Sequence, residues 1–154
     1  MNYKEFIKKA KANDLKPVYL FYGEENYLID YTLKMAKDIL IDEAFEPLNY
    51  IVLDGKEMDF DKILNACETL PFMSSKKIVI VKDLPLFKSK KESDEESNKL
   101  DTSKFNNQLI EYIGGLEDYL CLIFVEKLGS VKKTNSLYKK INKVGDALYR
   151  TDLI

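Results

Sequence analysis

The stretch VYLFYGEENYLIDYTLKMAKDIL, residues 18–40, joins a hydrophobic run, a glycine and an amphipathic pattern. Its first five residues are continuous and rich in residues that favour β-structure, which is typical of a central parallel strand covered on both faces. Beyond Gly23, hydrophobic residues recur at the helical period and predict a helix that runs toward Ile41. A strand, a glycine turn and a helix in this order are the usual framework of a phosphate-binding loop.

The rest of the chain alternates extended and helical patterns in the same way. Strands are predicted near residues 49–53, 77–81, 119–125 and 147–149, and helices near residues 3–13, 60–70, 105–113 and 135–143. This alternation predicts an open parallel sheet with helices on both faces, the doubly wound α/β class. Residues 88–104, KSKKESDEESNKLDTSK, contain no aromatic and only one aliphatic residue, so a flexible surface insertion is expected there.

The composition indicates one soluble domain and gives it no general affinity for polyanions. The chain has 154 residues, of which 45% are hydrophobic and 32% are charged, and its formal net charge is -2. No hydrophobic run approaches the ~20 residues of a membrane span, and the polar start lacks the hydrophobic core of a signal peptide. We therefore expect a cytoplasmic protein that does not bind a membrane.

The residue types that most enzymes of this size need are scarce. The chain has no histidine, which removes histidine-activated nucleophiles and the commonest metal ligand. Cys67 and Cys121 lie within hydrophobic patterns and outside any CxxC pair, so they are expected to be buried and unpaired. The sequence predicts no catalytic residue, no metal site and no cofactor.

The turn after Gly23 lacks the chemistry of a phosphate-binding loop. Such a loop has the pattern G-x-x-x-x-G-K-[ST], whose glycines let backbone N–H groups wrap the phosphates, whose lysine neutralises them and whose hydroxyl holds magnesium. The last three positions are occupied here by Leu28, Ile29 and Asp30. Two glutamates directly after Gly23 would also repel a triphosphate. We therefore predict a degenerate phosphate loop that binds no nucleotide, and no ATP hydrolysis.

Acidic residues near strand ends leave a second interpretation open. Asp54, Asp83 and Glu126 lie at the ends of predicted strands, and Glu24 and Glu25 follow the first strand. Carboxylates gathered at the carboxyl edge of a parallel sheet can surround magnesium, as in a phosphoacceptor signalling domain. Solvated carboxylates are the commoner explanation, and no residue is identified as the acceptor.

A basic segment near the end of the chain also has two interpretations. Residues 132–143 contain five lysines, with Tyr138 among them. Such a segment can contact DNA or an acidic partner, although a solvated helix face is the commoner explanation.

Two segments resemble the delta subunit family of the clamp loader of bacterial DNA polymerase III. They are KPVYLFYGEENYLID, residues 16–30, and ETLPFMSSKKIVIVKD, residues 68–83, and the order of elements around them also matches. The resemblance implies the N-terminal domain of that subunit, with a RecA-like fold of the AAA+ type and no ATPase activity of its own. The helical lid and the collar domain of the family are expected to be absent from residues 1–154.

The resemblance also implies partners and a binding site. Family members bind the ring-shaped sliding clamp and help to open it for loading onto DNA, while other clamp-loader subunits hydrolyse ATP and make most of the DNA contact. The matching clamp contact is a hydrophobic plug at Leu70, Pro71, Phe72 and Met73. Pro71 would fix the backbone so that Phe72 and Met73 project. From the residues alone, a place in the core is the commoner explanation, because Leu70 continues the stripe through Cys67 and Phe72 could pack under the sheet.

Overall fold

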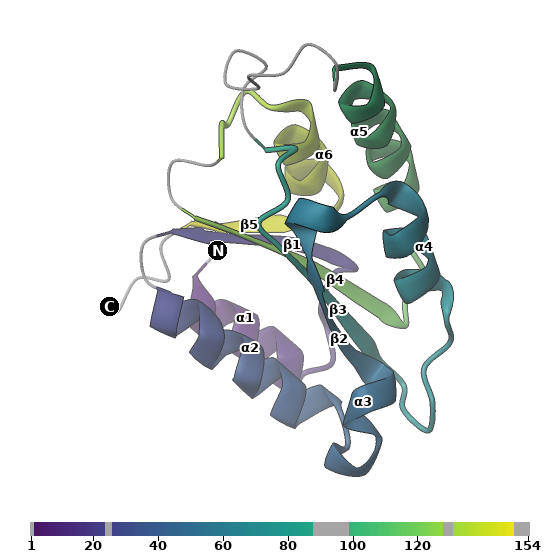
Figure 1. The fold of residues 1–154 in the computed structure, drawn as a ribbon. Coiled ribbons are helices and arrows are strands. Elements are labelled where there is room, and N and C mark those ends of the chain that lie inside the picture. The colour runs from purple at the N-terminus through teal and green to yellow at the C-terminus, as the bar shows by residue number, and fades with distance from the viewer. Residues whose placement is uncertain (1, 24–25, 88–98, 128–130, 150–154) are drawn as a thin grey trace.

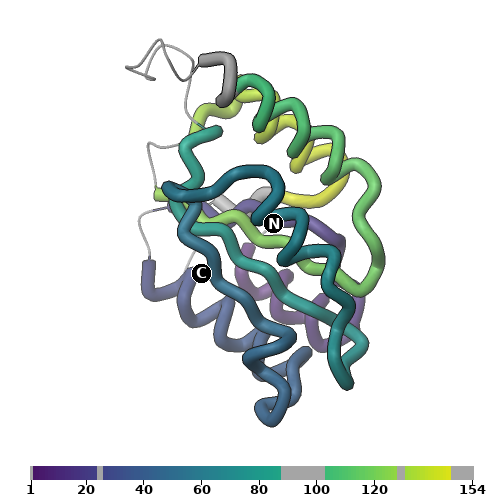
Figure 2. The backbone as a smooth tube through the Cα atoms, turned by 45° about the vertical axis from the view of Figure 1, so that its right-hand side comes forward, coloured from purple at the N-terminus to yellow at the C-terminus, as the bar shows by residue number. Residues whose placement is uncertain are grey.

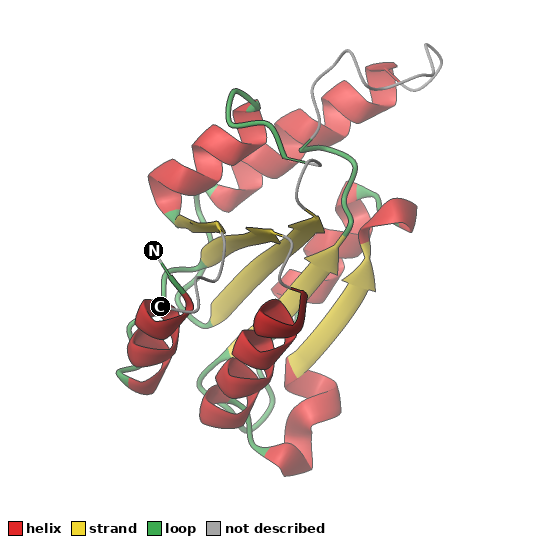
Figure 3. Ribbon diagram, turned by 90° about the vertical axis from the view of Figure 1, so that its left-hand side faces the viewer, coloured by secondary structure: helices red, strands yellow, loops and turns green. Residues whose placement is uncertain are grey.

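A five-stranded parallel sheet forms the middle of the structure, a computed structural model that describes residues 2–23, 26–87, 99–127 and 131–149 (Figure 1). The strands are β1 (Val18–Gly23), β2 (Tyr50–Asp54), β3 (Lys77–Lys82), β4 (Leu120–Lys127) and β5 (Asp146–Tyr149). They lie in the order β2-β3-β4-β1-β5, and every neighbouring pair is parallel. The arrows in Figure 3 therefore all run in one direction.

Helices cover both faces of this sheet. One face carries α1 (Tyr3–Lys11) and α2 (Asn26–Leu40), and the other carries α4 (Phe60–Glu68), α5 (Lys99–Ile113) and α6 (Ser136–Val144). Figure 2 shows α5 and α6 side by side on their face. Short helical segments η1 (Glu43–Phe45) and α3 (Glu46–Asn49) connect α2 to β2, and η2 (Gly55–Glu57) follows β2.

The central strands are hydrophobic throughout because both of their faces are covered. In β1, Leu20 and Tyr22 point toward α4, α5 and α6, whereas Tyr19 and Phe21 point toward α1 and α2. This alternation follows from the two-residue period of a strand. Every residue of β1 is buried, while the edge strand β2 is only partly covered. The long hydrophobic runs in the sequence are therefore the signature of interior parallel strands.

Two local features differ from the sequence-based expectation. Helix α5 begins at Lys99 rather than at Phe105, so residues 99–104 of the expected insertion are helical. Residues 88–98, the rest of that insertion, lie outside the described residues. The pair of short segments η1 and α3 was not predicted, because neither is long enough to display a helical period. In the described part of the chain, no helix has the length and apolar character needed to cross a membrane.

The two cysteines are buried on opposite faces of the sheet. Cys67, in α4, belongs to the core between the sheet and α4, α5 and α6. Cys121, in β4, belongs to the core between the sheet and α1 and α2. Both are free thiols, as the sequence predicted. Burial raises the pKa of each thiol to about 12, because a thiolate loses its hydration in the core.

We expect both thiols to react slowly with thiol reagents in the folded protein. An acid whose pKa rises on folding loses its proton first from the unfolded chain, so folding stability should fall as the pH rises from 9.0 toward about 12. Labelling at pH 8 with a chromogenic disulfide reagent should be slow without denaturant and fast with it. Rapid labelling of the folded chain at pH 8 would show that at least one thiol is accessible.

Candidate interaction site

The site predicted from the sequence lies in the segment between α4 and β3. This segment exposes three large hydrophobic side chains. Leu70 is 70% exposed, Phe72 50% and Met73 72%. These residues and Pro71 are called the hydrophobic plug below. The alternative that Leu70 or Phe72 lies in the core is therefore wrong. Adjacent exposed hydrophobic residues are unusual on a protein surface and typically mark a binding site.

The backbone leaves the helical path just before the plug. Helix α4 ends at Glu68, and Thr69 has extended backbone angles (φ -65°, ψ 123°). Pro71 cannot continue a helix because it lacks an N–H group. The backbone of Met73 lies in the left-handed region (φ 54°), which residues other than glycine and asparagine seldom adopt. The helical stripe that predicted a buried Leu70 therefore stops before reaching it.

A buried lysine holds the backbone just before the plug. Lys77, the first residue of β3, is fully buried, and its Nζ donates a hydrogen bond of 2.9 Å to the carbonyl oxygen of Thr69. The last carbonyl groups of a helix lack partners within the helix and attract positive charge, so a lysine at the end of α4 is well placed. Burial lowers the pKa of its ammonium group. The hydrophobic run predicted that Lys77 begins a strand, but no local pattern indicates its bond to Thr69.

A buried asparagine supports Phe72. The Nδ2 atom of Asn49 donates to the carbonyl oxygen of Phe72, and the N–H of Phe72 donates to Oδ1 of Asn49, both at 2.7 Å. The ring of Phe45 meets the ring of Phe72 edge-on, with 5.4 Å between centroids. No local sequence pattern links Asn49 and Phe45 to Phe72, because they lie more than 20 positions earlier in the chain.

The positions compared above with a phosphate loop, Leu28 to Asp30, lie at the opposite edge of the sheet from the plug. They belong to α2, which follows the carboxyl end of β1, whereas the plug precedes the amino end of β3, and the two strands run in the same direction. Leu28 and Ile29 are buried, and Ile29 packs in the core beneath α2. Asp30 is exposed. The lysine and second glycine positions of a phosphate loop are therefore filled by packing residues.

Two of the three strand-end carboxylates, those of Asp54 and Glu126, accept hydrogen bonds from nearby backbone. Asp54 accepts a hydrogen bond from the N–H of Lys56 at 3.0 Å, and Glu126, which is buried, accepts one from the N–H of Leu84 at 2.7 Å. Asp83 has a left-handed backbone (φ 59°). Among the residues that the structure describes, no group of three or more acidic or cysteine side chains is arranged to hold a metal ion. Glu24 and Glu25 of the phosphoacceptor interpretation lie outside those residues.

The basic segment divides between core and solvent. Tyr138 is buried, and its hydroxyl oxygen lies 3.3 Å from that of Tyr22, so its ring is not available to stack on a base. Lys139 and Lys143 are exposed on the outer side of α6. The burial of Tyr138 removes an aromatic contact to a base, whereas the exposed lysines are compatible with a solvated helix face and with a charged partner.

The sequence matches the protein family described as DNA polymerase III, delta subunit over residues 19–149. The chain belongs to this family. A curated relative, DNA polymerase III subunit delta of Bacillus subtilis (strain 168), is 28% identical over 136 residues, which are 86% of this chain and 38% of the relative. The delta-family chain described here thus spans well under half the length of that relative.

Solved structures share the fold of this delta-family chain. The Bacillus subtilis DNA clamp loader delta protein superposes with a TM-score of 0.78 at 23% identity, over 96% of this chain and 42% of the other. A DNA polymerase III, gamma subunit-related protein of Thermotoga maritima gives 0.59 at 13% identity, over 94% and 45%. The predicted α/β class, a parallel sheet of the clamp-loader type, is confirmed.

We expect Phe72→Ala to leave the fold of this chain intact. Phe72 is half exposed, so its truncation should cost about 1 kcal/mol or less of unfolding free energy. The matched control is Phe124→Ala in β4, which empties a fully buried site and should cost about 3–5 kcal/mol. Chemical denaturation followed by circular dichroism measures both. A similar loss in the two variants would mean that Phe72 is part of the core.

Proposed function

We propose that this delta-family chain binds a ring-shaped sliding clamp through the hydrophobic plug and, within a clamp loader, helps to open the ring for loading onto DNA. The exposure of Phe72 and Met73 on a fixed loop is the observation that supports this most directly. Partners in this proposal are the clamp and the other loader subunits, with DNA reached through the complex. Residues 1–154 act as a single RecA-like domain of a cytoplasmic protein.

The physical basis of this binding is the burial of hydrophobic surface on a partner. An exposed Phe or Met side chain that enters an apolar pocket contributes roughly 1.5–3 kcal/mol. Binding energy in protein interfaces concentrates in a few such anchors, and aromatic residues are prominent among them. A plug whose backbone is already fixed also loses less conformational entropy on binding. Leu70, Phe72 and Met73 together therefore suit a hydrophobic cleft on the clamp.

We expect Phe72→Ala to weaken clamp binding by about 2 kcal/mol or more, which is roughly 30-fold. Surface plasmon resonance with the immobilised sliding clamp of the same organism measures the effect. The control is Tyr31→Ala, which removes a ring of similar exposure (48%) from α2. Equal affinity of the Phe72 variant and the unmodified chain would rule out the plug as the clamp contact.

We also propose that this domain is not an enzyme and that nucleotide chemistry belongs to other subunits. The positions that would carry the phosphate-binding glycine and lysine are Leu28 and Ile29, and both side chains are buried. A Cβ and an apolar side chain at these positions leave no charge and no open backbone to hold phosphates.

Titration of Mg·ATP into the isolated chain should therefore give no binding at micromolar concentration. Isothermal calorimetry provides the measurement, and an active loader ATPase under the same buffer conditions provides the positive control. Saturable micromolar binding would contradict the assignment of a degenerate loop.

A further inference from the structure

Asn49 occupies an unusual place for a polar side chain. It is fully buried at the end of α3, and its amide group bonds to the main chain of Phe72, 23 residues later. Both bonds are 2.7 Å long. The amide therefore uses one donor and one acceptor, and both bond to the same residue, Phe72. The backbone N–H and C=O groups of Phe72 thus both have hydrogen-bond partners, while the side chain of Phe72 faces solvent.

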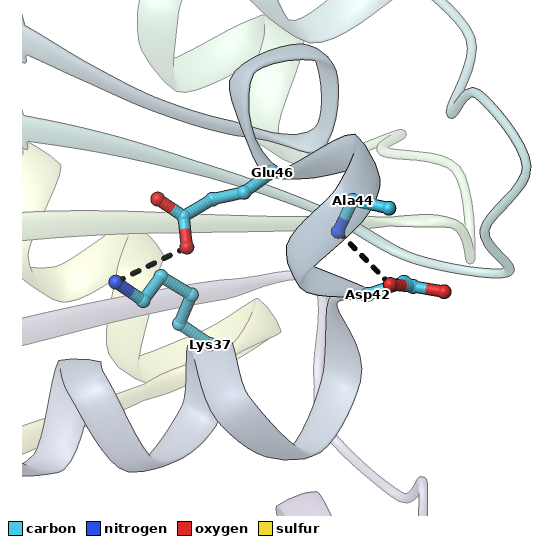
Figure 4. A network of polar contacts seen from close by, with 4 residues as sticks. All are labelled: Lys37, Asp42, Ala44 and Glu46. Atoms are coloured by element: carbon cyan, nitrogen blue, oxygen red, sulfur yellow. Dashed lines mark hydrogen bonds and ion pairs between the residues drawn. The ribbon is translucent and has the colours of Figure 1, made fainter.

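The segment that carries Asn49 is itself anchored to α2. Asp42 caps η1 by accepting a hydrogen bond of 3.0 Å from the N–H of Ala44, and Lys37 of α2 forms an ion pair of 3.3 Å with Glu46 (Figure 4). The support for Phe72 thus extends from a long helix through α3. Because the ion pair is partly exposed, it adds less than the two buried hydrogen bonds.

The support reaches both the backbone and the ring of Phe72. Asn49 holds the main chain, and Phe45 holds the ring through its edge-on contact. Met73 follows directly with its left-handed backbone, a conformation that persists only where neighbouring contacts impose it. Asparagine suits this role because its planar amide presents a donor and an acceptor together, whereas aspartate lacks the donor and leucine lacks both.

We propose that Asn49 is a positioning residue for clamp binding. It keeps Phe72 in the projecting conformation that enters the clamp, and it acts through Phe72 rather than by touching the clamp itself. This inference rests on the proposed function of the plug. It adds that the geometry of the plug is set by a segment outside it, between α2 and β2.

The test combines amide hydrogen exchange with a double-mutant cycle. Asn49→Ala should speed exchange at the Phe72 amide by about tenfold, the effect of losing one net hydrogen bond, and leave the amides of β3 unchanged. It should weaken clamp binding by about tenfold in the unmodified chain, yet have little further effect in the Phe72→Ala background. Asn49→Leu, which is of similar size and lacks both the donor and the acceptor, takes its place if the alanine variant does not fold.

Asn135→Ala is the matched control. The side chain of Asn135 also joins separate segments, bonding to the carbonyl oxygen of Leu86 at 2.7 Å and capping α6 through the N–H of Leu137 at 2.8 Å. This variant should lose stability without changing exchange at Phe72 or clamp affinity.

Three results separate the possible failures. Unchanged exchange at Phe72 in the Asn49 variants would overturn the positioning role. Fully additive losses of affinity would also overturn it, because they would mean that Asn49 acts independently of Phe72. If Phe72→Ala alone leaves clamp affinity unchanged, the proposed function fails, and the inference for clamp binding fails with it, whatever the exchange data show about the loop.

Discussion

The parallel direction of all five strands is the constraint on which the other features of this structure depend. Parallel neighbours cannot be joined by a tight turn, so each connection must cross a face of the sheet, and helices use that crossing to cover it. The strands consequently become hydrophobic on both sides. The same constraint gives the sheet two distinct edges, one where strands begin and one where they end. The plug and the start of α2 lie at different edges for this reason.

Three buried polar side chains, those of Asn49, Lys77 and Glu126, form hydrogen bonds between separate segments of the chain. Among the residues with described burial, the buried polar or charged ones are Thr32, Asn49, Lys77 and Glu126. Each of them hydrogen-bonds to a main-chain group. A buried polar group without a partner destabilises a fold, whereas one bonded to backbone fixes the conformation of a loop. Asn49 and Lys77 concentrate this effect beneath the plug.

Sequence predicted the fold well because its determinants are local. The continuous hydrophobic runs of β1 and β4 and the helical periods of α2 and α4 each lie within one element, so they can be read without knowing the neighbours. The start of α5 was misjudged, because charged residues near Lys99 give no hydrophobic period although they are helical. The hydrophobic stripe of α4 predicted a buried Leu70, but Leu70 is exposed because the helix ends at Glu68, before the stripe reaches it. The plug residues themselves were found through a resemblance. Their supports could not be found, because the bond from Asn49 to Phe72 joins positions that no local pattern connects.

Met73 shows how the demands of folding and of a surface can diverge at one residue. Its left-handed backbone is a conformation that glycine or asparagine adopts at lower free energy, and its side chain is 72% exposed and so adds little to the core. Substitution by glycine would relax the backbone, and selection for stability alone would therefore not favour methionine at this position. A long, flexible and polarisable side chain at this turn instead offers an adaptable contact to whatever molecule covers it.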